Sequence, residues 1–64
     1  MEAISERTFN SSDPDGLRAR LTEFDNYYVV TLIDVESGIV LPEAKRFPKS
    51  MQLQAVSYAI RCAG

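Results

Sequence analysis

The sequence predicts an α+β fold: a three-stranded antiparallel β-meander, open to one further amino-terminal strand, packed against one carboxy-terminal helix. Two turn signals divide residues 17–47 into three strand-like segments, whereas residues 49–64 have helical spacing of their apolar side chains. With 64 residues, the chain is long enough for one domain at most. We therefore expect a lead-in segment, residues 1–16, followed by a single ββ(β)α domain, residues 17–64.

The lead-in segment is the least determined part of the sequence. Its first nine residues, MEAISERTF, have no steady period, and the next seven, NSSDPDG, concentrate the residue types that form turns. A short strand, a frayed helix and disorder all remain open for residues 1–9.

The first two strands are predicted on either side of a tight turn. Apolar and polar residues alternate in LRARLTEF, residues 17–24, which is the period of a strand. Asp25 and Asn26 suit a two-residue hairpin turn, because Asn and Asp tolerate positive φ better than other non-glycine residues. The second strand, residues 27–35, is rich in β-branched and aromatic residues and has apolar side chains on both faces. One helix cannot cover both faces.

The third strand and the helix complete the predicted domain. A three-residue loop, ESG, ends at Gly38, which suits a left-handed backbone. The next strand, residues 39–47, contains Pro42 and so belongs at an edge or contains a bulge at PEA. The helix is predicted to begin at Pro48 or Ser50. The apolar stripe expected to pack on the sheet is Leu53, Val56, Ala59, Ile60 and Ala63.

Counting outward from the two turns assigns each strand residue to a face. The face expected to pack on the helix contains Leu17, Ala19, Leu21, Tyr28, Val30, Leu32, Val40 and Ala44. The opposite face is expected to be an interface made of Phe24, Tyr27, Val29, Ile33, Val35, Ile39 and Leu41, with Phe47 at its border. A slip of one residue at either turn would move a strand's side chains to the other face.

The second apolar face needs a cover. Either the lead-in segment folds across it with Ile4 and Phe9, or a second molecule does. We favour a second molecule and hence a small, non-enzymatic binding protein, which is most simply a symmetric homodimer or a partner of another protein.

Few chemistries are open to this chain. It has no histidine, and Cys62 is its one cysteine, so it can form neither an intramolecular disulfide nor a Cys/His zinc site. No serine has a histidine to activate it, and no glycine-rich phosphate loop occurs. We therefore expect no enzymatic activity, no cofactor and no metal. No segment has the ~18 consecutive apolar residues of a membrane helix, and no signal peptide is evident, so we expect a cytoplasmic protein without membrane contact.

The stretch NYYVVTLIDVESGIVLPEAKRFPKSMQLQAVSYA resembles the small modules at the amino termini of phage-type integrases and in plant AP2-like domains. There, a three-stranded sheet followed by one helix lies in the DNA major groove. The resemblance implies DNA contacts by Arg18, Arg20 and Lys45, in an accessory module of a mobile element. Because the net charge is −2, we nevertheless expect no appreciable binding to nucleic acid.

A further alternative follows from the acidity. The chain resembles, in size and charge, the small acidic phage proteins, including CRISPR inhibitors, that occlude a nucleic-acid-binding protein. The acids that would serve this role are Asp13, Asp15, Glu23, Asp25, Asp34 and Glu36.

Overall fold

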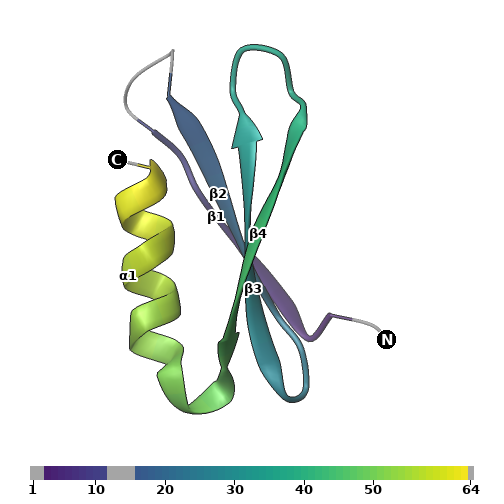
Figure 1. The fold of residues 1–64 in the computed structure, drawn as a ribbon, viewed down its shortest axis with the longest axis vertical. Coiled ribbons are helices and arrows are strands. Elements are labelled where there is room, and N and C mark those ends of the chain that lie inside the picture. The colour runs from purple at the N-terminus through teal and green to yellow at the C-terminus, as the bar shows by residue number, and fades with distance from the viewer. Residues whose placement is uncertain (1–2, 12–15, 64) are drawn as a thin grey trace.

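The computed structural model describes residues 3–11 and 16–63. Four antiparallel strands form one sheet in the order β1-β2-β3-β4, and a single helix lies across one face (Figure 1). The elements, in chain order, are β1 (Ser5–Phe9), β2 (Leu17–Glu23), β3 (Tyr27–Asp34), β4 (Val40–Pro48), the 3-10 turn η1 (Lys49–Met51) and α1 (Gln52–Ala63). The predicted class is therefore correct, and the amino-terminal strand that the sequence left open is present.

The β2–β3 hairpin has the predicted register. Phe24 N–H donates to the Tyr27 carbonyl at 2.9 Å, so Asp25 and Asn26 form the two-residue turn. The pairs then run from Glu23 opposite Tyr28 to Leu17 opposite Asp34. The expected reason for the turn is wrong, however: no described non-glycine residue has a positive φ, so this turn forms without the left-handed conformation.

The β3–β4 hairpin differs from the prediction by one residue. Asp34 N–H donates to the Ile39 carbonyl at 2.9 Å, and Gly38 N–H donates to the Asp34 carbonyl at 2.7 Å. The loop therefore has four residues, Val35 to Gly38, rather than three. The Asp34 carboxylate accepts the Glu36 N–H at 3.0 Å, which starts the turn one residue early. Gly38 has the predicted left-handed backbone, with φ of 75°.

This shift moves β4 side chains to the opposite faces. Val40 pairs with Ile33 and Ala44 pairs with Thr31, so both lie on the face away from α1, where we did not expect them. Leu41 and Phe47 instead pack into the core beneath α1. The two predictions about Pro42 are confirmed, because β4 is an edge strand and its register is irregular between Val40 and Ala44.

β1 lies beside β2 in the plane of the sheet. Ser5 to Phe9 pair with Glu23 to Ala19, and Phe9 packs against the core on the helix side. The expectation that Ile4 and Phe9 form a lid over the opposite face is therefore wrong. The turn-rich residues 12–15 lie outside the described part of the chain.

The helix contacts the sheet through small side chains. Ala55, Ala59 and Ala63 are buried against the sheet, whereas Leu53 and Ile60, both expected in this stripe, are exposed. The sheet supplies the bulk of the core with larger side chains, among them Tyr28 and Val30. Because these fill much of the space between the layers, the fully buried positions of α1 are alanines, while Val56, Tyr58 and Cys62 pack against the core with partly buried side chains.

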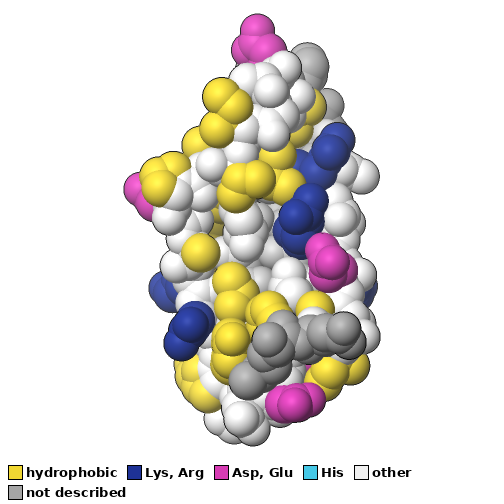
Figure 2. Space-filling view, turned by 90° about the vertical axis from the view of Figure 1, so that its right-hand side faces the viewer, with side chains coloured by type: hydrophobic (Ala, Val, Ile, Leu, Met, Phe, Trp, Pro, Cys, Tyr) yellow, Lys and Arg dark blue, Asp and Glu magenta, His cyan; other side chains and the backbone are white. Residues whose placement is uncertain are grey.

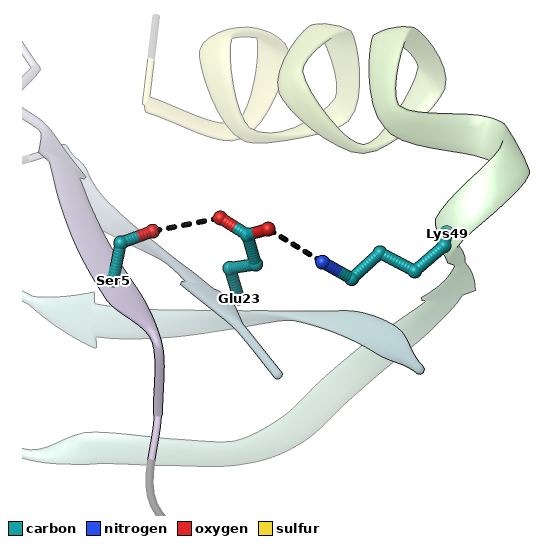
Figure 3. A network of polar contacts seen from close by, with 3 residues as sticks. All are labelled: Ser5, Glu23 and Lys49. Carbon is teal, nitrogen blue, oxygen red and sulfur yellow. Dashed lines mark hydrogen bonds and ion pairs between the residues drawn. The ribbon is translucent and has the colours of Figure 1, made fainter. Parts of the chain in front are cut away.

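A short polar network fastens the start of the helical region to the sheet (Figure 3). The Glu23 carboxylate, at the end of β2, accepts hydrogen bonds from Ser5 of β1 at 3.0 Å and from the Lys49 ammonium of η1. The hydrogen bond from Lys49 lowers the pKa of Glu23, and the same bond raises the pKa of Lys49. Lys49 also lies 5.0 Å from the centre of the Tyr28 ring.

Candidate interaction surfaces

The face of the sheet opposite α1, here called the outer face, is not covered by any described helix or strand (Figures 1 and 2). Strand pairing and the alternation of side chains define its members. They are Glu6 and Thr8 of β1; Arg18, Arg20 and Thr22 of β2; Tyr27, Val29, Thr31 and Ile33 of β3; and Val40, Ala44 and Arg46 of β4.

One end of the outer face is aromatic. Phe24 and Tyr27, at the two sides of the β2–β3 turn, stack with ring centroids 4.9 Å apart. The Arg46 guanidinium lies 4.7 Å from the centre of the Tyr27 ring. These side chains and Val29 are all at least partly exposed. Ile33, farther along β3, is buried. This end therefore presents aromatic rings and a cation together.

The middle of the outer face is polar. Arg20 lies between Thr8 of β1 and Thr31 of β3 in one cross-strand row, and Thr22 lies in the next row, beside Val29. Arg20 forms an ion pair with Glu6 at 3.4 Å across the β1–β2 pair. Figure 2 accordingly shows hydrophobic side chains interrupted by polar and basic ones. The outer face is thus more polar than the sequence predicted.

The other end is apolar again, beside the β3–β4 loop. Val40 is 52% exposed on this face, and Val35 in the adjoining loop is also exposed. Ile39 is 62% exposed but lies opposite Asp34, so it is not on this face, contrary to the prediction. Ile33 is different: it lies on the outer face but is only 6% exposed. Its predicted place on this face is correct, but its side chain is covered within the chain and offers little area to a partner.

Charge is unevenly distributed over the molecule. Among the described strand residues of the outer face are three arginines, Arg18, Arg20 and Arg46, and one acid, Glu6. Glu23 is engaged with Lys49, and the charge of Glu43 acts on Tyr58 on the helix side. The outer face is therefore basic, although the whole chain has a net charge of −2.

The described acids of the occluding alternative lie at the two ends of the sheet. Glu23 and Asp25 lie at the β2–β3 turn, whereas Asp34 and Glu36 lie at the opposite end of β3. Asp13 and Asp15 lie outside the described residues. The described acids thus offer no single acidic surface.

Two of the predicted contact residues lie on the wrong side of the sheet. Leu41 packs into the core beneath α1. Lys45 pairs with Val30, and its ammonium lies 5.5 Å from the Phe47 ring and 4.9 Å from the Tyr58 ring. Both displacements follow from the one-residue shift in β4. Arg46, which we did not select, takes the place on the outer face that was assigned to Lys45.

A second exposed surface lies on α1. Leu53 is 81% exposed and Ile60 is 54% exposed, on the side of the helix away from the sheet. Next to Leu53, a groove of about 270 Å³ runs between α1 and β4, lined by Phe47, Leu53, Gln54, Ser57, Tyr58 and Arg61. The helical spacing of Leu53 and Ile60 was visible in the sequence, but we assigned both residues to the core.

Reactive groups are sparse in the described part of the chain. No group of three or more histidine, cysteine, aspartate or glutamate side chains there is placed to hold a metal ion. Cys62 is a free thiol, partly covered, and a hydrogen bond with it raises the pKa of Tyr58. Among the described residues, no helix has the length and apolar character needed to cross a membrane.

Comparisons of the chain with protein-family models, with curated proteins and with solved structures found no match.

Proposed function

We propose that this chain is a non-enzymatic binding protein whose outer face docks on an acidic surface of another protein. The observation that carries the proposal is the grouping of three arginines with exposed apolar ends on the one sheet face that α1 leaves open. An apolar patch bordered by charge is typical of an interaction site.

The composition of the outer face supports a protein as the partner. Tyrosine and arginine are enriched at protein interfaces and dominate their binding energy. Tyr27 and Arg46 already lie in contact, with the guanidinium over the ring. Docking would therefore fix a pair that is largely ordered beforehand, so little conformational freedom is lost.

The charge of the outer face argues against the homodimer that we expected there. A symmetric pair through this face would set its arginines against the arginines of an identical copy, with one glutamate from each to offset them. Like charges brought together across an interface lower affinity. An acidic partner meets the same arginines favourably.

Nucleic acid is the second candidate, because the same observation favours it. Arg18, Arg20 and Arg46 could contact phosphates, and the Phe24–Tyr27 pair offers rings on which unpaired bases stack. The acidic balance of the remaining surface opposes it, since phosphate binding benefits from a broad basic surface. We therefore rank it below an acidic protein.

The test begins with a photo-crosslinking amino acid placed at Tyr27 in the cells that produce the protein. The partner proteins in the cross-linked adducts are identified by mass spectrometry, purified separately and titrated against the chain. We expect an acidic protein whose affinity falls about 10-fold or more with Arg46→Glu, since it reverses the charge that lies over the Tyr27 ring. Arg7→Glu makes the same charge change on the helix side and should leave the affinity within about two-fold.

Two outcomes would count against the proposal. Equal effects of Arg46→Glu and Arg7→Glu would mean that only net charge matters and that the outer face is not the docking site. The second outcome is measured by fluorescence anisotropy with short single-stranded and duplex oligonucleotides. Micromolar affinity that weakens steeply with salt, and is lost in Arg46→Glu, would place nucleic acid first.

A further inference from the structure

We infer that the acidic partner of the outer face presents two separate acidic groups, one for Arg18 and one for Arg46, with a neutral surface between them. The inference rests on the function proposed above and adds the spacing of charge that the partner needs.

The three arginines of the outer face differ in whether an acid already lies beside them. Arg20 forms its ion pair with Glu6 at 3.4 Å, across the β1–β2 pair. Among the described residues, no acid lies within ion-pair distance of Arg18 or Arg46, and both side chains are exposed. An approaching acid is attracted by Arg18 or Arg46 alone, whereas near Arg20 it is also repelled by Glu6. The partner's acids therefore gain most at Arg18 and Arg46.

Strand pairing sets the distance between these two arginines. Arg18 of β2 lies opposite Ile33, and Arg46 of β4 lies opposite Val29, four residues earlier on β3. Four residues of a strand span about 13 Å, and β2 and β4 are two strand spacings, about 10 Å, apart. The two Cα atoms are thus about 16 Å apart, diagonally across the outer face. Figure 2 shows basic side chains spread along this face rather than gathered at one place.

The contact between Arg46 and Tyr27 keeps the two cations apart. The guanidinium lies 4.7 Å from the centre of the Tyr27 ring, and Tyr27 is two residues nearer to the β2–β3 turn than Val29. The contact therefore draws the Arg46 side chain away from Arg18. It does not use the N–H groups of the guanidinium, which stay available to donate to both oxygens of a carboxylate.

The row between the two arginines offers no uncompensated charge. Arg20, Thr31 and Ala44 lie side by side in this row, and Glu6 offsets the charge of Arg20. Thr31 and Ala44 have short side chains, so a neutral surface can approach them closely. An evenly charged polymer such as nucleic acid would place phosphates here as well as at the two ends, and so it matches this pattern poorly.

Two proline peptides of equal length and charge serve as rulers. Each has capped ends and two glutamates, which are six positions apart in the long ruler and three positions apart in the short ruler. A polyproline helix rises about 3.1 Å per residue with three residues per turn, so the two glutamates lie on one side, about 19 Å or about 9 Å apart. Nitrogen-15 NMR of the arginine side chains at low salt measures both dissociation constants. We expect the long ruler to bind about three-fold or more tightly, because only this ruler reaches Arg18 and Arg46 together.

Matched variants assign the preference for the long ruler to these two arginines. Arg18→Gln and Arg46→Gln should each abolish the preference, because one contact is lost. Arg7→Gln removes the same charge on the helix side and should keep it. The paired variant Glu6→Gln with Arg20→Gln removes the central ion pair without changing the net charge, and it should also keep the preference.

Three results would overturn the inference: equal binding of the two rulers, a preference that persists in Arg18→Gln, or no binding of either ruler at ~10 mM. A cross-linked partner whose acids form a single cluster would overturn it too. None of these results decides the proposed function, which fails when Arg46→Glu and Arg7→Glu weaken the cross-linked partner equally.

Discussion

The two faces of this one sheet differ in burial and in composition. On the helix side, Val30 and its neighbours in the core are buried beneath the alanines of α1, so the layer above holds them in place. On the outer face, threonines and arginines separate the apolar residues, and most side chains keep some contact with water. The same strands supply both, because their side chains alternate. The comparison teaches that alternate positions of the same strands supply the core and the exposed face.

The largest effect on the free energy of unfolding is expected from a substitution on the helix side of the sheet. Leu32→Ala removes a buried side chain from the core and should lower the free energy of unfolding by roughly 2–5 kcal/mol. That is a large share of the ~3–10 kcal/mol typical of a domain of this size. Val29 lies three residues before Leu32 in the same strand, but on the outer face. Val29→Ala should lower the free energy of unfolding by less than about 1 kcal/mol. Urea denaturation of both variants decides the matter, and equal costs would mean that the two faces are not distinct.

A smaller effect tests how closely α1 approaches the sheet. Ala59 is fully buried, so Ala59→Leu should force the two layers apart and lower the free energy of unfolding by about 1–3 kcal/mol. Gln54→Leu places the same leucine side chain at an exposed position of the same helix and should change the free energy of unfolding by no more than about 0.5 kcal/mol. Thermal unfolding followed by circular dichroism gives both values. If Ala59→Leu left the free energy of unfolding unchanged, α1 would pack on the sheet more loosely than the structure shows.

The smallest effect sharpens the description of the polar network at the border of the helix side. Glu23→Gln removes the charge that Lys49 and Ser5 contact, and the melting temperature should fall by a few degrees at neutral pH. Because the pKa of Glu23 is lowered from its ordinary value of 4.5, the network stabilises the fold above that pH and loses its contribution as the pH falls below it. The pKa of Lys49 is raised above 10.5, so the contribution is also lost in strong alkali.

Melting temperatures of the wild type and Glu23→Gln across this pH range give the measurement. The two curves should be separated at neutral pH and should meet at both extremes. Glu36→Gln removes an exposed carboxylate in the β3–β4 loop and serves as the control. A separation that persists in acid would show that the charge of Glu23 is not the cause.

The fold could be predicted from sequence where local signals act alone. Alternation in residues 17–24 and the Asp25–Asn26 turn fixed the whole β2–β3 register. The β3–β4 register could not be predicted, because one side-chain hydrogen bond, from Glu36 N–H to Asp34, lengthens the loop by a residue. The four-residue loop that this bond and two backbone hydrogen bonds close sets the face on which Leu41 and Lys45 lie.

The surfaces were harder to predict than the strands. Leu53 and Ile60 have the spacing of a buried stripe, and periodicity does not distinguish a stripe that meets the sheet from one that meets solvent. The deciding factor is volume: the sheet is already filled by large side chains, so α1 turns its alanines inward. The basic outer face was likewise hidden, because net charge averages over both faces.

The build of β4 has a consequence for solubility. An edge strand exposes unpaired N–H and C=O groups, and a long regular one invites strands from other molecules, which is the first step toward fibrils. β4 spans nine residues, but Pro42 and Pro48 lack the N–H that such growth requires, and the register breaks near Pro42. At the opposite edge, β1 is only five residues long and contains Glu6 and Arg7. Both edges of the sheet thus resist edge-to-edge pairing with strands of other molecules.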